Sequence, residues 1–249
     1  MLILLQCSIP MGTVAVAAAP EPLLKVNTLT PVVGQPVELS LNLPTGEDWT
    51  QANIGQLVVR AAIHREDEGL EVQRSLSTTP AAGQSSLSYT FEQPGYAMLI
   101  LDAGPSTERN QSDSWQRTSF CTKVVLHVIG AGAVGEATAT AVDPGLSAKV
   151  GQRVELLPLI SPATIRPGND LPVRVYMDGE KKAGVEVRAY RPDGQANVQT
   201  TTPGGVAVFR ITEPGRWMIR FETTHQDKLF IAELVFDVAA AAKAPGASQ

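Results

Sequence analysis

The chain has 249 residues, a formal net charge of −5 and 43% hydrophobic residues, which is enough for one large domain or two of about 100 residues each. The sequence is acidic and contains no run of Lys or Arg. This argues against nucleic acid as a partner, because a phosphate backbone requires a basic surface. The 21 glycines and 18 prolines favour a fold with many turns.

Residues 1–19 are predicted to be a signal peptide. The segment is apolar and ends in the small residues Ala17 and Ala19, which suit a cleavage site before Pro20. It contains no Lys or Arg, unlike the usual basic start of such peptides; a membrane anchor or a lipid attached at Cys7 are the alternatives. No later segment approaches the ~20 apolar residues that span a bilayer. We therefore expect a periplasmic or secreted protein without a transmembrane helix in the mature chain.

Cys121 is the one cysteine left after cleavage at this position, so the mature chain is expected to lack an intrachain disulfide. An exported fold without disulfides fits a bacterial periplasm or cell surface. The apolar neighbours Phe120 and Val124 favour a buried structural cysteine over a reactive thiol.

The first half, residues 20–130, is predicted to form a β-sandwich. Apolar and polar residues alternate over positions 37–43, which indicates a strand with one buried face. The acidic segment 65–69 is expected to be a hairpin tip, and the polar span 104–117 an exposed loop. Further strands are expected at residues 57–63, 88–91, 96–101 and 123–129.

The second half, residues 150–238, shows the same pattern more clearly. Asp178-Gly179 and Pro192-Asp193-Gly194 are strong turn sequences between short alternating segments. About seven strands, with a turn roughly every ten residues, are typical of a β-sandwich. The expected strands include residues 154–158, 173–177, 185–190, 206–211, 216–223 and 229–238.

The two halves share a weak internal similarity. Residues 92–101 and 213–221 both place Pro-Gly directly before a long apolar strand, which two related sandwiches in tandem would explain. The predicted fold is therefore all-β, with two tandem immunoglobulin-like β-sandwich domains after a signal peptide. The expected divisions are a signal peptide at 1–19, an N-terminal sandwich at 20–130, a linker at 131–149, a C-terminal sandwich at 150–238 and a disordered tail at 239–249.

Gly130-Ala-Gly-Ala-Val-Gly135 imitates a dinucleotide-binding fingerprint, since it follows an apolar strand. That chemistry needs a helix whose N-terminus faces the pyrophosphate. The following segment is short and rich in Thr, and Pro144-Gly145 ends it. A linker of small residues between two domains is the preferred interpretation.

Three residues near the end of the second half are the candidate metal ligands. Glu222, His225 and Asp227 lie close together at an expected turn, and an imidazole with carboxylates suits a divalent transition metal. A solvated turn with ordinary polar residues is the alternative. His64 is expected to be exposed on its strand, and His127 to be a packed sandwich residue.

The sequence does not predict an enzyme. No Gly-x-Ser-x-Gly motif occurs, and no histidine has the context of a catalytic triad. Asp170 and Asp178 occupy turn positions, where carboxylates bond to the local backbone. Trp217 is expected in the core, whereas Trp49 and Trp115 lie in expected loops and are candidates for an exposed contact.

Several short motifs of strands and turns recur through the second half. They are Val154–Pro158 with Ser161-Pro162, Arg166–Gly168 before Leu171–Val175, Asp178-Gly179 with Ala183–Val187, Gly205–Phe209 and Pro214–Trp217. Through these motifs the second half resembles a bacterial periplasmic family of domains of unknown function, some members of which are described as periplasmic components of nickel or cobalt uptake systems. The resemblance covers residues 150–238 well and the first half more loosely. One departure is that the mature start, residues 20–25, lacks the histidine that members of the family often carry near this point.

We therefore expect a non-catalytic, exported accessory or binding protein. The resemblance implies an association with nickel or cobalt uptake, with a membrane transporter as partner and a divalent transition metal as ligand. The alternative is a structural or adhesive module that binds a protein or a glycan at the cell envelope.

Overall fold

The computed structural model describes residues 19–42, 57–65, 69–76, 86–103, 117–131, 144–226 and 228–240. Nearly all regular structure in these residues is β, as predicted. The strands of the first half are β1 (Leu24–Val26), β2 (Pro36–Leu41), β3 (Leu57–Arg65), β4 (Gly69–Leu76), β5 (Ser86–Thr90), β6 (Gly95–Ala103) and β7 (Arg117–Val128).

The second half begins with two short 3-10 helices around its first strand, η1 (Pro144–Ser147) and η2 (Pro162–Thr164). Its strands are β8 (Val154–Pro158), β9 (Asp170–Met177), β10 (Glu180–Lys181), β11 (Glu186–Tyr190), β12 (Ala196–Thr200), β13 (Val206–Arg210), β14 (Gly215–His225) and β15 (Lys228–Val238). No helix in the described part of the chain is long and apolar enough to cross a membrane.

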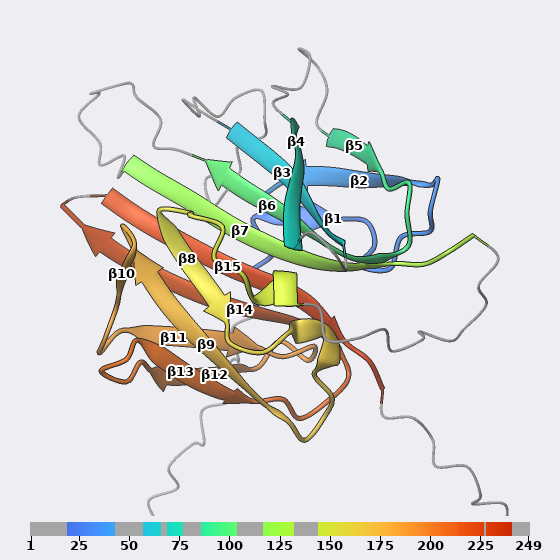
Figure 1. The fold of residues 1–249 in the computed structure, drawn as a ribbon. Coiled ribbons are helices and arrows are strands. Elements are labelled where there is room, and N and C mark those ends of the chain that lie inside the picture. The colour runs from blue at the N-terminus through green and yellow to red at the C-terminus, as the bar shows by residue number, and fades with distance from the viewer. Residues whose placement is uncertain are drawn as a thin grey trace, which may run out of the picture.

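One large sheet runs through both halves of the chain (Figure 1). Its eight strands are ordered β12-β11-β14-β15-β7-β6-β3-β4. The halves meet where β7 and β15 pair in parallel, with Thr122 opposite Glu233 and Lys123 opposite Leu234. Two smaller sheets complete the fold, β1-β2-β5 and β10-β9-β13, the latter with β8 also paired to β9.

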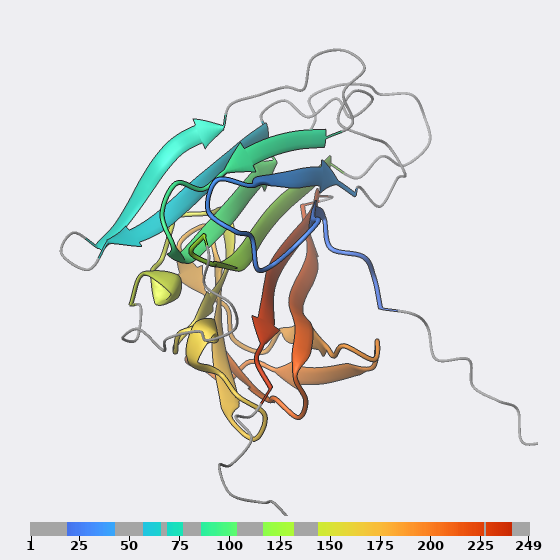
Figure 2. The same cartoon turned by 90° about the vertical axis from the view of Figure 1, so that its right-hand side faces the viewer.

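The two small sheets cover opposite faces of the large sheet (Figures 1 and 2). Successive side chains of a strand point to opposite faces. Val124 and Val235 accordingly pack with β1 and β2, around Val37 and Leu39. Residues on the opposite face of the same strands, among them Cys121 and Leu234, belong to a second core with Val173, Val175, Phe209 and Trp217. The sandwich layers are thus confirmed, while the division into two domains stays a prediction.

The predicted turns form where local sequence demands them. Asp178 and Gly179 have φ values of 51° and 84° and join β9 to β10 as a two-residue turn. In both Pro-Gly pairs the glycine is the first residue of a strand, Gly95 of β6 and Gly215 of β14. Gly215 has φ 113°, and a Cβ there would lie 3.0 Å from Pro192 Cγ, so the position requires glycine.

Four strands escaped the sequence analysis: β1, β4, β10 and β12. The hairpin of β3 and β4, with Arg65 opposite Gly69, shows that β4 begins where the predicted tip ends. The tip itself at 66–68, most of the predicted 104–117 loop, linker residues 132–143 and tail residues 241–249 lie outside the described residues.

Candidate functional site

A buried ion pair joins the two halves on one face of the large sheet. Lys123 Nζ of β7 donates to Glu155 Oε1 of β8 at 2.6 Å, and both side chains are fully buried. Lys123 Nζ also donates to the Leu156 carbonyl oxygen at 3.3 Å. Burial lowers the pKa of Lys123, and the Glu155 carboxylate opposes that shift.

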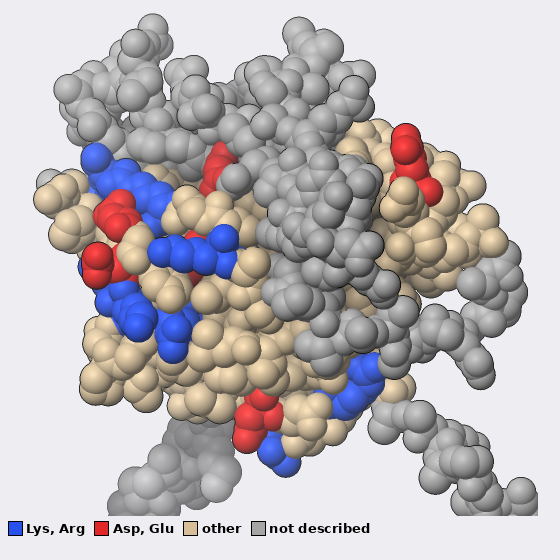
Figure 3. All heavy atoms as spheres, viewed as in Figure 1, with Lys and Arg blue, Asp and Glu red and all other residues tan. Residues whose placement is uncertain are grey.

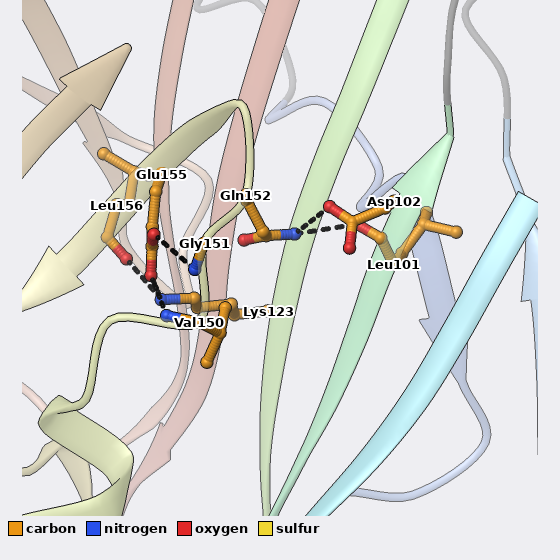
Figure 4. Close-up of polar contacts among 8 residues, drawn as sticks. All are labelled: Leu101, Asp102, Lys123, Val150, Gly151, Gln152, Glu155 and Leu156. Carbon is orange, nitrogen blue, oxygen red and sulfur yellow. Dashed lines mark hydrogen bonds and ion pairs between the residues drawn. The ribbon is translucent and has the colours of Figure 1, made fainter. Parts of the chain in front are cut away.

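The same carboxylate holds the segment before β8 (Figure 4). The Val150 and Gly151 N–H groups donate to its two oxygens at 2.7 and 3.1 Å. Gln152 Nε2 then donates to the Leu101 carbonyl oxygen of β6 at 2.9 Å. This network has no access to solvent at its charged centre, so its role is to fix the junction between the halves.

A second buried carboxylate lies on the opposite face. Glu233 of β15 is 1% exposed. It accepts hydrogen bonds from Leu23 N at 2.8 Å, from Thr122 Oγ1 at 3.4 Å and from Arg220 Nη1 at 3.0 Å. Burial raises the pKa of Glu233 to about 7, although these donors oppose the shift. The bond to Leu23 fastens the N-terminal segment to the centre of the sheet.

Glu233 belongs to a row of cross-strand neighbours that leads from the core to solvent. The row pairs Glu233 with Arg220, Arg220 with Arg188, and Arg188 with Val198 of β12. Exposure rises along it, from buried Glu233 to Val198 at 47%. The large sheet is thus open to solvent on this face over β11 and β12.

A shallow pocket of about 140 Å³ lies on this open face, lined by Glu186, Arg188, Tyr190, Arg220 and Glu222. Arg220 Nη2 donates to Glu222 Oε2 at 3.0 Å, and Arg188 Nη2 lies 3.7 Å from Glu186 Oε2. Sites for cofactors and drug-sized ligands occupy about 300–1,000 Å³. The pocket is therefore of a size for a single side chain. Its lining would offer both cationic and anionic groups to that side chain.

The predicted metal ligands are only partly placed. Glu222 and His225 both lie on β14 and are exposed. Because they are three residues apart on a strand, their side chains leave on opposite faces. Asp227 lies outside the described residues. No group of three or more His, Cys, Asp or Glu is arranged to hold a metal in the part of the chain that the structure describes. The metal site stays a prediction.

Other predicted residues lie where expected. Trp217 is 1% exposed in the core, and its indole Nε1 donates to the Glu213 carbonyl oxygen at 3.0 Å. Cys121 is buried, and burial raises the pKa of its thiol to about 12, so it remains protonated and unreactive. His127 is half-buried and stacks on the Tyr96 ring at 4.7 Å between centroids. Trp49, Trp115 and the His64 side chain lie outside the described residues.

Sequence reasoning missed Lys123, Glu155 and Glu233. Each is a charged residue in a largely apolar strand segment: Lys123 in TKVVL, Glu155 in VELLP and Glu233 in FIAELVF. A charge at such a position must be paired when it is buried. That pattern was the available signal, but it does not identify the partner.

Comparisons with known proteins place the chain in one family. Residues 29–225 match a family described as a domain of unknown function, DUF4198. Among curated proteins, none matches significantly.

Similarities to solved structures are weak. The ectodomain (Ig1–Ig3) of mouse nectin-like molecule 4 is 14% identical, with coverage of 93% of this chain and 67% of the other and a TM-score of 0.25. A two-domain fibronectin type-III segment of chicken tenascin is 8% identical, covering 86% and 97%, with a TM-score of 0.24. The D00-D0 domain of intimin is 15% identical, covering 86% and 98%, with a TM-score of 0.23.

Proposed function

The chain belongs to this family of domains of unknown function, and we propose that it is an exported, non-catalytic binding module whose partner is an envelope protein. The partner adds an extended segment to the free edge of β12 and places a side chain in the pocket over β11 and β14. The proposal combines the predicted signal peptide at 1–19 with the open face of the large sheet.

The edge strand β12 is the observation that carries this proposal. It ends the large sheet, and among the described residues it pairs with β11 alone. Edge strands are usually protected from other chains by charged residues or proline. The sequence of β12, Ala-Asn-Val-Gln-Thr, contains neither. An edge of this kind supports the addition of a strand from a partner.

The outward-facing backbone groups of β12 follow from its pairing with β11. Arg191 N–H donates to the Gln195 oxygen, and Thr201 N–H to the Val185 oxygen, each at 2.9 Å. Hydrogen-bonded pairs alternate along an antiparallel ladder. The pair of Arg188 and Val198 is therefore not hydrogen-bonded, and the N–H and C=O of Val198 point away from β11.

Val198→Pro tests the proposal, because it removes an outward donor and leaves the β11 ladder intact. The tagged full chain is used to capture proteins from envelope extracts, and the retained proteins are identified by mass spectrometry. Val198→Pro and Val198→Glu are expected to lose a partner that the unaltered chain retains.

Val208→Glu is the matched control, since Val208 of β13 is 46% exposed and Val198 is 47% exposed. It introduces the same charge at a different strand and is expected to retain the partner. If Val198→Pro still retains the partner, or if Val208→Glu loses it to the same extent as the Val198 variants, the proposal is contradicted.

The association with transition-metal uptake remains the other hypothesis. It rests on the resemblance and on Glu222, His225 and Asp227, and a transporter as the partner is compatible with both hypotheses. No contact of the described residues adds support to it.

A further inference from the structure

We infer that the outer face of the small sheet formed by β8, β9 and β10 binds a phosphate group, at a site built around Tyr176 by Lys149, Arg174 and Lys181. The site lies on a different sheet from β12 and its pocket, and it is independent of the proposed strand addition.

The geometry of the strands brings these residues together. Lys181 of β10 is the cross-strand neighbour of Tyr176. Arg174 precedes Tyr176 by two residues on β9, so both side chains leave the same face. Lys149 Nζ lies 4.3 Å from the centroid of the Tyr176 ring and donates to the Gly179 carbonyl oxygen at 3.2 Å. The Tyr176 ring thus has Lys149 against it and two further cations at neighbouring positions on its face of the sheet.

These cations lack the carboxylate partners that several other basic residues have. Arg210, for example, is paired with Asp170 at 3.2 Å. No described carboxylate pairs with Lys149, Arg174, Lys181 or the adjacent Lys182. In Figure 3 basic side chains gather at the left of the view, over β8 and β10, with acidic side chains among them.

The nearby acids do not neutralise this cluster. Glu155, the cross-strand neighbour of Tyr176, is paired with Lys123. Asp178 is occupied by Arg153, whose Nε donates to it at 2.9 Å. Glu180 precedes Lys181 on β10, so its side chain leaves the opposite face. The result is a local positive charge on a chain whose formal net charge is −5, which favours an anionic ligand.

Arg174 has an unsatisfied donor at this face. Its Nε is buried and has no hydrogen-bond partner among the described atoms. A buried donor without an acceptor is costly, and such groups are uncommon in native proteins. A guanidinium matches phosphate geometry with several donors, and a shift of the Arg174 side chain toward a bound phosphate would bring its buried Nε within reach of an acceptor.

The position of Lys149 is prepared before a ligand arrives. The next two residues, Val150 and Gly151, donate their N–H groups to the buried Glu155 (Figure 4). Glu155 is in turn the cross-strand neighbour of Tyr176. The backbone beside Lys149 is fixed in this way and its Nζ is already bonded to the Gly179 oxygen, so the side chain loses less conformational freedom on binding.

Titration of the full chain with inorganic phosphate at low ionic strength, followed by calorimetry, tests the site. We expect saturable binding that weakens as salt is added, because the charges are near solvent. Lys181→Gln and Arg174→Gln are each expected to weaken binding about tenfold. Arg216→Gln removes one charge at the start of β14 and is expected to leave the affinity unchanged.

Sedimentation with vesicles distinguishes the two sources of phosphate. Co-sedimentation with phosphatidylglycerol vesicles, but not with pure phosphatidylcholine, would identify a lipid headgroup, whereas binding of inorganic phosphate alone would identify a soluble ligand. Binding of neither probe, or equal weakening by Arg216→Gln, would overturn the inference. Thermal unfolding checks each variant, and Lys181→Gln carries the test if Arg174→Gln fails to fold.

Discussion

Arg220 and Glu233 are cross-strand neighbours on β14 and β15, and Arg220 Nη1 donates to Glu233 Oε1 at 3.0 Å. Arg220 Nη2 also donates to Oε2 of the exposed Glu222 at 3.0 Å. Arg220 therefore connects the buried carboxylate that holds Leu23 with the pocket on the open face. A change in the charge of Glu233 would act on both.

Stability is expected to fall as pH rises from about 4.5 to about 7. The pKa of Glu233 is raised from 4.5 to about 7 in the folded protein. Between these values the folded state binds more protons than the unfolded state. The stabilisation is therefore complete below the unfolded pKa and is lost as pH rises through the folded pKa, with a total of roughly 3 kcal/mol. Urea unfolding at several pH values measures this slope.

Glu233→Gln is expected to flatten that slope, because the amide does not titrate. Glu222→Gln removes the other carboxylate bound to Arg220, at an exposed position, and is the control that should keep it. Equal slopes in the unaltered protein and in Glu233→Gln would contradict the assignment to Glu233.

Removal of one partner from the Lys123–Glu155 pair is expected to destabilise the protein strongly. Lys123→Met leaves a buried carboxylate without its cation, which costs about 3–5 kcal/mol. Lys25→Met is the control, because Lys25 and its partner Glu21 are 47% and 62% exposed and such pairs contribute about 0–1 kcal/mol. Chemical denaturation compares the two variants, and equal losses would show that burial of the pair is unimportant.

Gly215→Ala is expected to cost more stability than Gly34→Ala. Both glycines have positive φ, 113° and 79°, but only at Gly215 does a Cβ meet a neighbour, Pro192 Cγ at 3.0 Å. We expect about 2–3 kcal/mol at Gly215 and about 1 kcal/mol at Gly34. Thermal and urea unfolding measure both, and the reverse order would contradict the turn geometry.

The metal hypothesis predicts a saturable heat when the mature protein is titrated with nickel, cobalt, zinc or copper. His225→Ala is expected to remove it, because an imidazole is the strongest of the three proposed ligands for these metals. His127→Ala, which replaces a half-buried histidine stacked on Tyr96, is the control. A titration without heat above that of buffer would refute metal binding.

Local features were predictable because they depend on the backbone of a few residues. Asp178-Gly179 forms its turn and the glycine of each Pro-Gly pair begins its strand, since glycine permits the positive φ that these positions need. The alternation of Val37 and Leu39 with polar residues likewise identified a strand with one buried face. By contrast, β12 has no large apolar run and is recognisable through its ladder with β11.

The sequence by itself thus determined the β class, the turns and most of the strands, because period-two alternation and turn residues act over short distances. Tertiary structure alone decided that β7 pairs with β15 across more than 100 positions of sequence, and that Lys123 and Glu233 find their partners on opposite faces. It also brought Lys149 and Lys181 to one tyrosine. The physical reason is that strand pairing fixes neighbours through backbone hydrogen bonds, and these depend on the register of distant segments rather than on local composition.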